Sequence, residues 1–310
     1  MKQVDITIVR PRRWWRWRKT SVWRREIPES WTDVPDSRRL RFWSWAVTMP
    51  LAEATEHILK EILHLPAWAW PLLDAEAKAT LSERLGWVAP KADAADMPLR
   101  QFEHRGTVYH FPTPQGDNVV CLEYPIADDF FGAAIEGKPG AATNLLATLC
   151  RESRNDHRAT LLHDDPRQPL LSRADALDRA KRLQGVPTEI ETAALLYFAG
   201  LKAFVLKVYG KWIFDMEDDD EDDEDDEDEE DNPEPDPTPP PASRWPNFGW
   251  WGIFQDVAES GAFGPVPQVH QTSFHEVCIW LVRQRVKAEQ MKESTSTPSR
   301  TTRRDDNYND

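Results

Sequence analysis

An unbroken run of fifteen acidic residues, 217–231, divides this 310-residue chain into two unequal parts. The chain has 38 Lys and Arg against 53 Asp and Glu, so the run accounts for the whole net charge of −15. Adjacent carboxylates repel one another and offer no apolar surface, so the run cannot offset its own ordering entropy. A proline-rich stretch follows and favours an extended backbone. We therefore expect residues 217–244 to form a disordered tether.

Two roles for the tether stay open. A charge run of this kind is usually a solvated linker that keeps a protein soluble. The run could instead mimic nucleic-acid phosphate, or screen a basic surface of the same chain at a high effective concentration. An electrostatic contact of the second kind would weaken steeply with salt.

The tether sets the expected domain organisation. Residues 1–216 should form a mainly helical core that opens with a β-hairpin, and residues 292–310 should form a disordered tail. The intervening segment, 245–291, is short for an independent domain because small chains bury a low fraction of their surface. We expect this C-terminal helical segment to dock on the core.

Apolar spacing predicts a mostly α fold with a helical bundle-like core. In residues 51–65 the apolar positions recur every three or four residues, which marks one face of a helix. Comparable segments predict helices over residues 36–47, 51–65, 74–85, 127–135, 141–151, 173–183, 187–208 and 273–287. Alternating apolar residues predict one or two small β-hairpins, pairing strand 4–8 with 21–27 and strand 105–111 with 119–124.

Cysteine content and hydropathy indicate a cytoplasmic protein. The three cysteines are an odd number, lie far apart and have no metal-binding spacing, which suits a reducing compartment. Residues 192–214 are long and apolar enough to span a bilayer but carry three lysines. We therefore predict a buried helix here and no membrane span.

The basic, tryptophan-rich segment 10–25 is the first candidate binding site. It holds eight basic residues and four tryptophans, and such a mixture lets cations meet phosphates while indoles stack on bases. An anionic membrane surface would suit it equally. A hairpin with one tryptophan face packed on the core is the structural alternative. The candidate polyanion-binding residues are Arg12, Arg13, Trp14, Trp15, Arg16, Trp17 and Arg18.

The aromatic segment 248–263 is the second candidate, for binding a protein partner. Glycines interrupt it and leave some of its rings hard to bury, which favours an exposed aromatic surface. The alternative is that the rings simply dock the segment on the core. The candidate partner-binding residues are Phe248, Trp250, Trp251, Phe254 and Phe263.

The sequence carries no recognisable catalytic motif, so we expect no enzyme, no cofactor and no metal site. His57 and His64 are seven residues apart on one helix face, too far apart to chelate one ion together. The cluster of His163, Asp164 and Asp165 is more typical of a solvated loop than of a catalytic pair.

Five short segments carry a resemblance to a known group of proteins. They are IPESW at 27–31, LLATLCR at 145–151, DDPRQPL at 164–170, LLYFAG at 195–200 and WWGIFQDVAESGAFG at 250–264. In this order they resemble uncharacterised tailed-bacteriophage and prophage proteins of the tail-assembly type, encoded beside the tape-measure protein. The resemblance covers most of residues 21–285, and its motifs are structural.

The resemblance implies a non-enzymatic role in the bacterial cytoplasm, or as a minor component of the virion. The implied partner is a phage tail protein, with the tape-measure protein as one candidate, and nucleic acid is the alternative partner. The resemblance carries over no catalytic residues, and the oligomeric state stays open.

Overall fold

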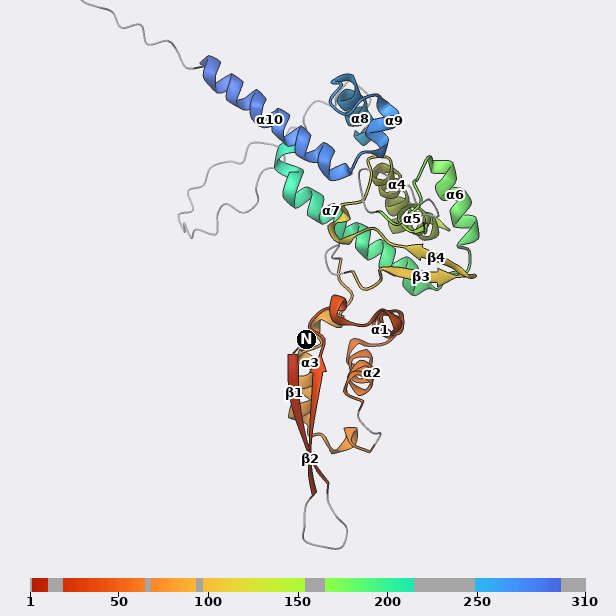
Figure 1. The fold of residues 1–310 in the computed structure, drawn as a ribbon, viewed down its shortest axis with the longest axis vertical. Helices are drawn as coiled ribbons and strands as arrows, with labels where there is room; N and C mark the ends of the chain where they lie inside the picture. The colour runs from red at the N-terminus through yellow and green to blue at the C-terminus, as the bar shows by residue number, and fades with distance from the viewer. Residues whose placement is uncertain are drawn as a thin grey trace, which may run out of the picture.

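The computed structural model describes residues 2–10, 19–64, 68–92, 97–153, 165–214 and 249–296. Over these residues the chain is mostly helical, with ten α-helices and two small antiparallel sheets, so the predicted fold class is confirmed. Figure 1 shows two lobes, a smaller one from the N-terminal part of the chain and a larger one from the rest. The predicted tether, 217–244, lies outside the described residues.

The smaller lobe packs three helices beside a two-stranded ribbon. Its elements are β1 (Lys2–Arg10), β2 (Lys19–Ile27), α1 (Asp36–Thr48), α2 (Leu51–Leu63) and α3 (Ala75–Glu83). Proline precedes both α1 and α2, and the side chain of Asp74 caps α3 by accepting the Ala77 N–H at 2.7 Å. The predicted first hairpin and these three predicted helices are confirmed to within a few residues at each end.

The larger lobe contains the longest helix of the described chain, α7 (Thr188–Phe214), together with six other helices and a small sheet. Its strands are β3 (Gln101–His104), β4 (Thr107–His110) and β5 (Arg151–Glu152), in the order β3-β4-β5. Its helices are α4 (Glu123–Ile135), α5 (Ala141–Leu149), α6 (Arg173–Arg182), α7 (Thr188–Phe214), α8 (Gly249–Glu259), α9 (Val266–Gln271) and α10 (Phe274–Ser296). Helix α5 packs against α4, α6 and α7, which makes it the centre of this lobe.

The second predicted hairpin was misplaced. The prediction paired 105–111 with 119–124, whereas the structure pairs β3 with β4 and places residues 123–124 in α4. Arg105 and Gly106 both have positive φ, 51° and 78°, and so form a two-residue turn that closes the hairpin early. Pro125 lies in the first turn of α4, where a missing N–H costs no helical hydrogen bond.

Helix α7 covers the predicted buried helix over 192–214, and it runs six residues past the end of the helix predicted over 187–208. By length and composition alone it could cross a membrane, but half of its most apolar window is buried inside the protein. Core helices of soluble proteins share these properties. Its buried residues include Tyr197, Phe198 and Leu201, which face the centre of the larger lobe.

The C-terminal segment docks on the core, as predicted. Phe254, Val257 and Phe274 are fully buried, and they belong to the same apolar cluster as the buried residues of the smaller lobe. The backbone N–H of Phe274 donates to the Val119 carbonyl at 2.8 Å, and the Phe214 and Trp250 rings meet edge to face at 5.5 Å. Helix α10 runs to Ser296, well past the predicted end at 287 and the expected boundary at 291, because residues 288–296 contain neither glycine nor proline to stop it.

One tryptophan joins the two lobes. The Trp43 side chain of α1 is 1% exposed, and its indole N–H donates to the Glu189 carbonyl of α7 at 2.7 Å. Trp31 meets Trp43 edge to face at 5.7 Å, and Trp87 meets Trp31 in the same way at 5.1 Å. These three rings form an aromatic cluster within the smaller lobe, and Trp43 links that cluster to α7 of the larger lobe.

We predict that Trp43→Ala destabilises the protein by about 3–5 kcal/mol, because it removes a buried indole and its hydrogen bond to α7. Chemical denaturation followed by circular dichroism measures this loss. The exposed Leu72 provides the control, since Leu72→Ala should leave the free energy of unfolding within about 0.5 kcal/mol of the wild-type value. Equal stabilities for the two variants would contradict the packing described here.

Candidate functional site

The aromatic candidates of the C-terminal segment are mostly packed inward. Phe254 is fully buried, and the half-buried Trp250 meets Tyr124 and Phe274 at ring distances of 5.4 and 4.8 Å. Phe263 lies edge to face against Trp280. Trp251 is 39% exposed, and Phe248 lies outside the described residues. Most of this candidate surface therefore serves docking, and Trp251 is its exposed member.

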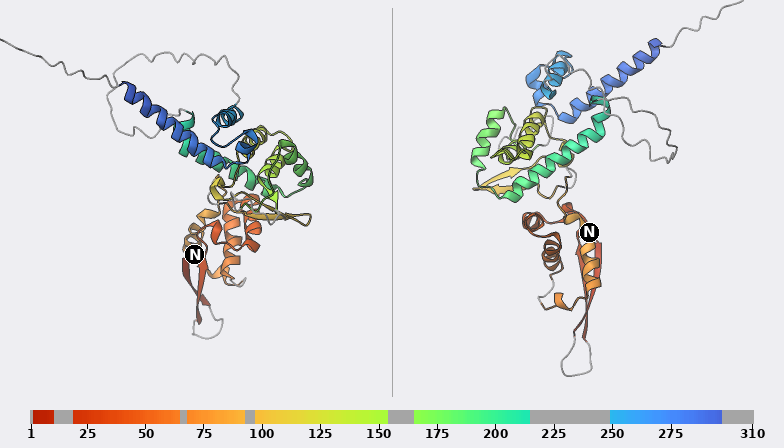
Figure 2. Two further views of the ribbon diagram at one scale, coloured as in Figure 1. Left: turned by 45° about the horizontal axis from the view of Figure 1, so that its top comes forward. Right: turned by 180° about the vertical axis from the view of Figure 1, so that it is seen from behind.

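The basic candidate segment lies outside the described residues, but the strands that flank it do not. Strand β1 pairs with β2 from Lys2 opposite Ile27 to Arg10 opposite Lys19. Ile6 and Ile27 are buried against the lobe, and the ribbon then runs on past α3 in all three views (Figures 1 and 2). The seven candidates that the ribbon carries between its strands are Arg12, Arg13, Trp14, Trp15, Arg16, Trp17 and Arg18.

The histidines are distributed over separate contacts. His57 lies against the Trp45 ring, and His275 hydrogen-bonds the Tyr209 hydroxyl and the Gln115 carbonyl. Over the described residues no group of three His, Cys, Asp or Glu side chains is placed to hold a metal ion. His163 and Asp164 lie outside those residues.

A serine just after β5 and a histidine at the end of β4 do come together. The Ser153 hydroxyl and the His110 Nε2 are 2.7 Å apart, and burial lowers the pKa of His110 against the opposing effect of Asp165. The Asp165 carboxylate accepts hydrogen bonds from Arg167 and Asn118 instead. Among the described residues no carboxylate hydrogen-bonds the His110 ring, so the pair lacks the group that would orient a catalytic base.

A buried charge cluster holds the larger lobe together, and the sequence did not reveal it. The Glu123 side chain is fully buried in the first turn of α4. Its two carboxylate oxygens each accept a hydrogen bond at 2.9 Å, one from Arg151 and one from Arg167. Both arginines are 1% exposed. One carboxylate therefore joins α4, β5 and the segment that leads to α6.

Arg167 makes the largest number of contacts within this cluster. Its guanidinium donates to the carbonyls of Leu149 and Asn118 at 2.8 and 2.7 Å, and to Asp165 at 2.9 Å. These bonds satisfy two backbone acceptors that would otherwise be buried without partners. Arg179 continues the pattern, donating to the Ala147 carbonyl and to Glu152.

The cluster keeps its arginines charged. Burial, followed by the neighbouring Arg167, lowers the pKa of Arg151 to about 10. Burial also opposes the charge on Arg167, but Glu123 and Asp165 outweigh it and raise the pKa of Arg167 above its ordinary value. Both side chains are therefore protonated at neutral pH, and each depends on a nearby carboxylate to offset its desolvation.

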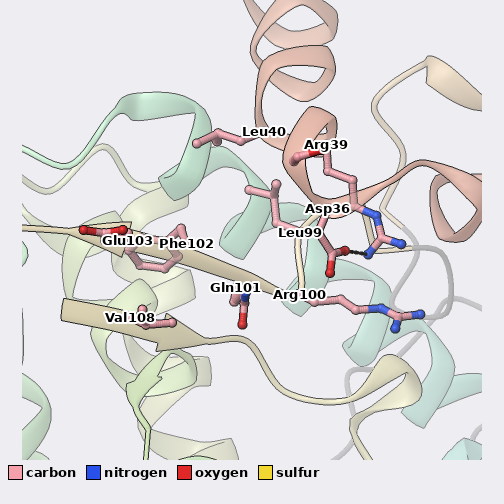
Figure 3. A pocket seen from close by; sticks show the side chains of 10 residues that line it. Asp36, Arg39, Leu40, Leu99, Arg100, Gln101, Phe102, Glu103 and Val108 are labelled. Carbon is pink, nitrogen blue, oxygen red and sulfur yellow. Dashed lines mark ion pairs between the residues drawn. The ribbon is translucent and has the colours of Figure 1, made fainter. Parts of the chain in front are cut away.

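An open cleft of about 340 Å³ lies between the two lobes (Figure 3). One wall is the first turn and a half of α1, and the other is strand β3 with Val108 of β4. Leu99 and Phe102 are buried within it, whereas Leu40 and Val108 are 40% and 38% exposed. The strand predicted here begins at residue 105, whereas β3 spans Gln101–His104 and forms one wall of the cleft. The cleft could therefore not be expected from the sequence.

Comparison with protein-family models, with curated proteins and with solved structures finds no match. Any function must therefore be inferred from the chain's own residues and their placement.

We predict that Glu123→Gln destabilises the protein by about 3–5 kcal/mol, because it leaves two buried guanidinium groups without their shared counter-ion. Thermal and denaturant unfolding measure the loss. Glu136 is exposed and pairs only with the exposed Lys138 within the described residues, so Glu136→Gln should change stability by less than about 0.5 kcal/mol. A stable Glu123→Gln variant would show that the cluster contributes little.

Proposed function

We propose that this chain is a non-enzymatic phage protein that acts in tail assembly, or as a minor virion component, through protein contacts. The observation that supports it best is helix α10. Phe274, Val277 and Cys278 are buried at the start of this helix, and Trp280, Leu281 and Val282 pack against the core while partly buried. None of the described side chains beyond Val282 belongs to that core. The helix extends past the end of α7 in every view (Figures 1 and 2).

The projecting part of α10 packs little against its own lobe, so a bound partner would stabilise it. Isolated helices are marginal in water, and most helical stability in proteins comes from packing an apolar face. Ile279 and Val286 lie seven residues apart, which places them on one face two turns from each other. Ile279 is 44% exposed and Val286 is half-buried. This face suits a hydrophobic groove or a second amphipathic helix.

The identity of the partner comes from the resemblance described above. Proteins of that type are encoded beside the tape-measure protein, so the proposed partner is a tail protein. The described part of the chain supports a binding role because it presents a long helix without burying most of it.

We expect the full-length protein to capture a tail protein from the lysate of phage-producing cells, identified by mass spectrometry after nuclease treatment and a high-salt wash. The double variant Ile279→Lys with Val286→Lys should recover about tenfold less, because it places charge on the apolar face. The matched control adds the same charge at exposed positions of α10, as Gln284→Lys with Ala288→Lys. Equal loss in both variants, or no tail protein at all, would refute the role.

A second candidate function is binding of nucleic acid by the ribbon, and the placement of the strands favours it. Strands β1 and β2 stay paired as far as Arg10 and Lys19, beyond the helices of the smaller lobe (Figure 2). The sequence that connects these two strands, 11–18, contains four arginines and three tryptophans. A positive, aromatic segment on an extended support can reach phosphate and base together.

This candidate predicts salt-sensitive binding to single-stranded poly(dT), measured by fluorescence anisotropy. Replacing Arg12, Arg13, Arg16 and Arg18 with Gln should abolish binding and its salt dependence. In a plot of the logarithm of the binding constant against the logarithm of the salt concentration, each phosphate contact contributes a slope of about −0.7. Deleting 217–231 should strengthen binding, because the acidic run competes for the same cations. Replacing Arg283 and Lys287 of α10 with Gln is the control. If neither the arginine substitutions nor the deletion changes the affinity for poly(dT), this candidate is eliminated.

A further inference from the structure

We infer that the open edge of β3, beside the cleft between the lobes, is a site where an extended peptide adds as a fourth strand. This inference goes beyond the proposed function, because it concerns a different surface and does not depend on α10. The sheet order β3-β4-β5 leaves β3 at an edge. Figure 1 shows β3 between β4 on one side and α1 on the other.

The hydrogen-bond register shows which backbone groups of β3 are open. The Phe111 N–H donates to the Arg100 carbonyl at 2.9 Å, and Gln101 lies opposite His110. Because backbone groups alternate in direction along an antiparallel strand, Arg100, Phe102 and His104 face β4. Gln101 and Glu103 therefore turn their N–H and C=O groups away from it. Over the described residues, neither of them has a hydrogen bond on that side.

The open backbone groups of β3 favour an extended occupant, because they can pair with the N–H and C=O groups of another strand. The walls of the cleft are α1 and the open edge of β3, and its volume of about 340 Å³ is lined along β3 from Arg100 to Glu103. An extended peptide needs only the width of one strand, about 4.8 Å from its neighbour. The occupant is therefore a short extended segment of a partner protein.

The side chains around the cleft define the chemistry of that segment. Leu40 of α1 offers exposed apolar surface on the wall that faces β3, and Val108 lies beyond β3, opposite Glu103 (Figure 3). A β-branched residue in the middle of the added strand suits this apolar lining. Arg100 and Glu103 lie at the two ends of the open edge, and neither makes an ion pair within the described residues. An antiparallel strand that places a basic residue opposite Glu103 and an acidic residue opposite Arg100 complements both charges.

Addition of a strand combines two sources of affinity. Main-chain hydrogen bonds to Gln101 and Glu103 give binding that is independent of sequence, and the flanking side chains select the peptide. Unpaired strand edges attract other chains, and natural proteins usually protect them. Here α1 stands beside the edge and lines the same cleft, so an added peptide contacts both β3 and α1.

The test uses the full-length protein and a fluorescein-labelled peptide, Thr-Lys-Val-Thr-Glu-Thr-amide, whose Lys and Glu oppose Glu103 and Arg100. We expect saturable binding by fluorescence anisotropy, and weaker binding of the peptide in which Lys and Glu are exchanged. We also expect hydrogen exchange at the amides of Gln101 and Glu103 to slow on binding. The amides of Phe102 and His104, already bonded to β4, should not change.

Two substitutions at one position separate backbone from side chain. Glu103→Ala removes the carboxylate and keeps the outward N–H, whereas Glu103→Pro removes that N–H and leaves the β3–β4 hydrogen bonds intact. Binding should be about tenfold weaker in the proline variant than in the alanine variant, since one main-chain hydrogen bond is lost. If Glu103→Pro fails to melt cooperatively, Leu40→Arg replaces it, because Leu40 is exposed on the opposite wall.

Three results would overturn the inference. One is equal affinity in the alanine and proline variants with unchanged affinity in Leu40→Arg. Another is unaltered exchange at Gln101 and Glu103 at millimolar peptide. The third is exchange at these amides that already slows with protein concentration in the absence of peptide, which would assign the edge to a second copy of the chain.

Discussion

The larger lobe depends on one buried carboxylate. Glu123 is shared by Arg151 and Arg167, and these arginines in turn hold the ends of strand β5 and the segment before α6. Charges buried this deeply are costly unless each is paired and its remaining hydrogen-bonding groups are satisfied. Here the carbonyls of Leu149 and Asn118 complete the shell around Arg167. Short, irregular segments are thereby fixed where apolar packing alone would leave them undefined.

The local elements of this fold could be predicted from sequence, and the long-range polar contacts could not. The apolar spacing in α2 and the capping Asp74 of α3 are local signals, and both were interpreted correctly. Glu123 was expected in a strand, because nothing near it in sequence shows that its partners lie 28 and 44 residues away. Arg151 and Arg167 stood in two segments that carried the resemblance, but no periodicity marked them as buried.

The candidate sites show the same division. Glycines around Trp250 and Phe254 suggested exposed rings, yet Trp250 packs against Tyr124 and Phe274 and is half-buried. Phe254 packs against Trp250 and is fully buried. The open edge of β3 was missed because Arg105 and Gly106 were expected inside a strand, and positive φ at both makes them a turn instead. The predictions were therefore wrong at residues with positive φ and at residues whose partners lie far away in the sequence.

The edge-to-face contact between Phe214 and Trp250 has a consequence for the chain between them. It holds the end of α7 against the start of α8, so the two points that residues 215–248 connect lie close together. The entropy of closing a loop grows only logarithmically, by about 0.6 kcal/mol for each doubling of its length. The core is therefore almost indifferent to how long the insertion is. A change in the length of this connection therefore alters the free energy of folding by only a small amount.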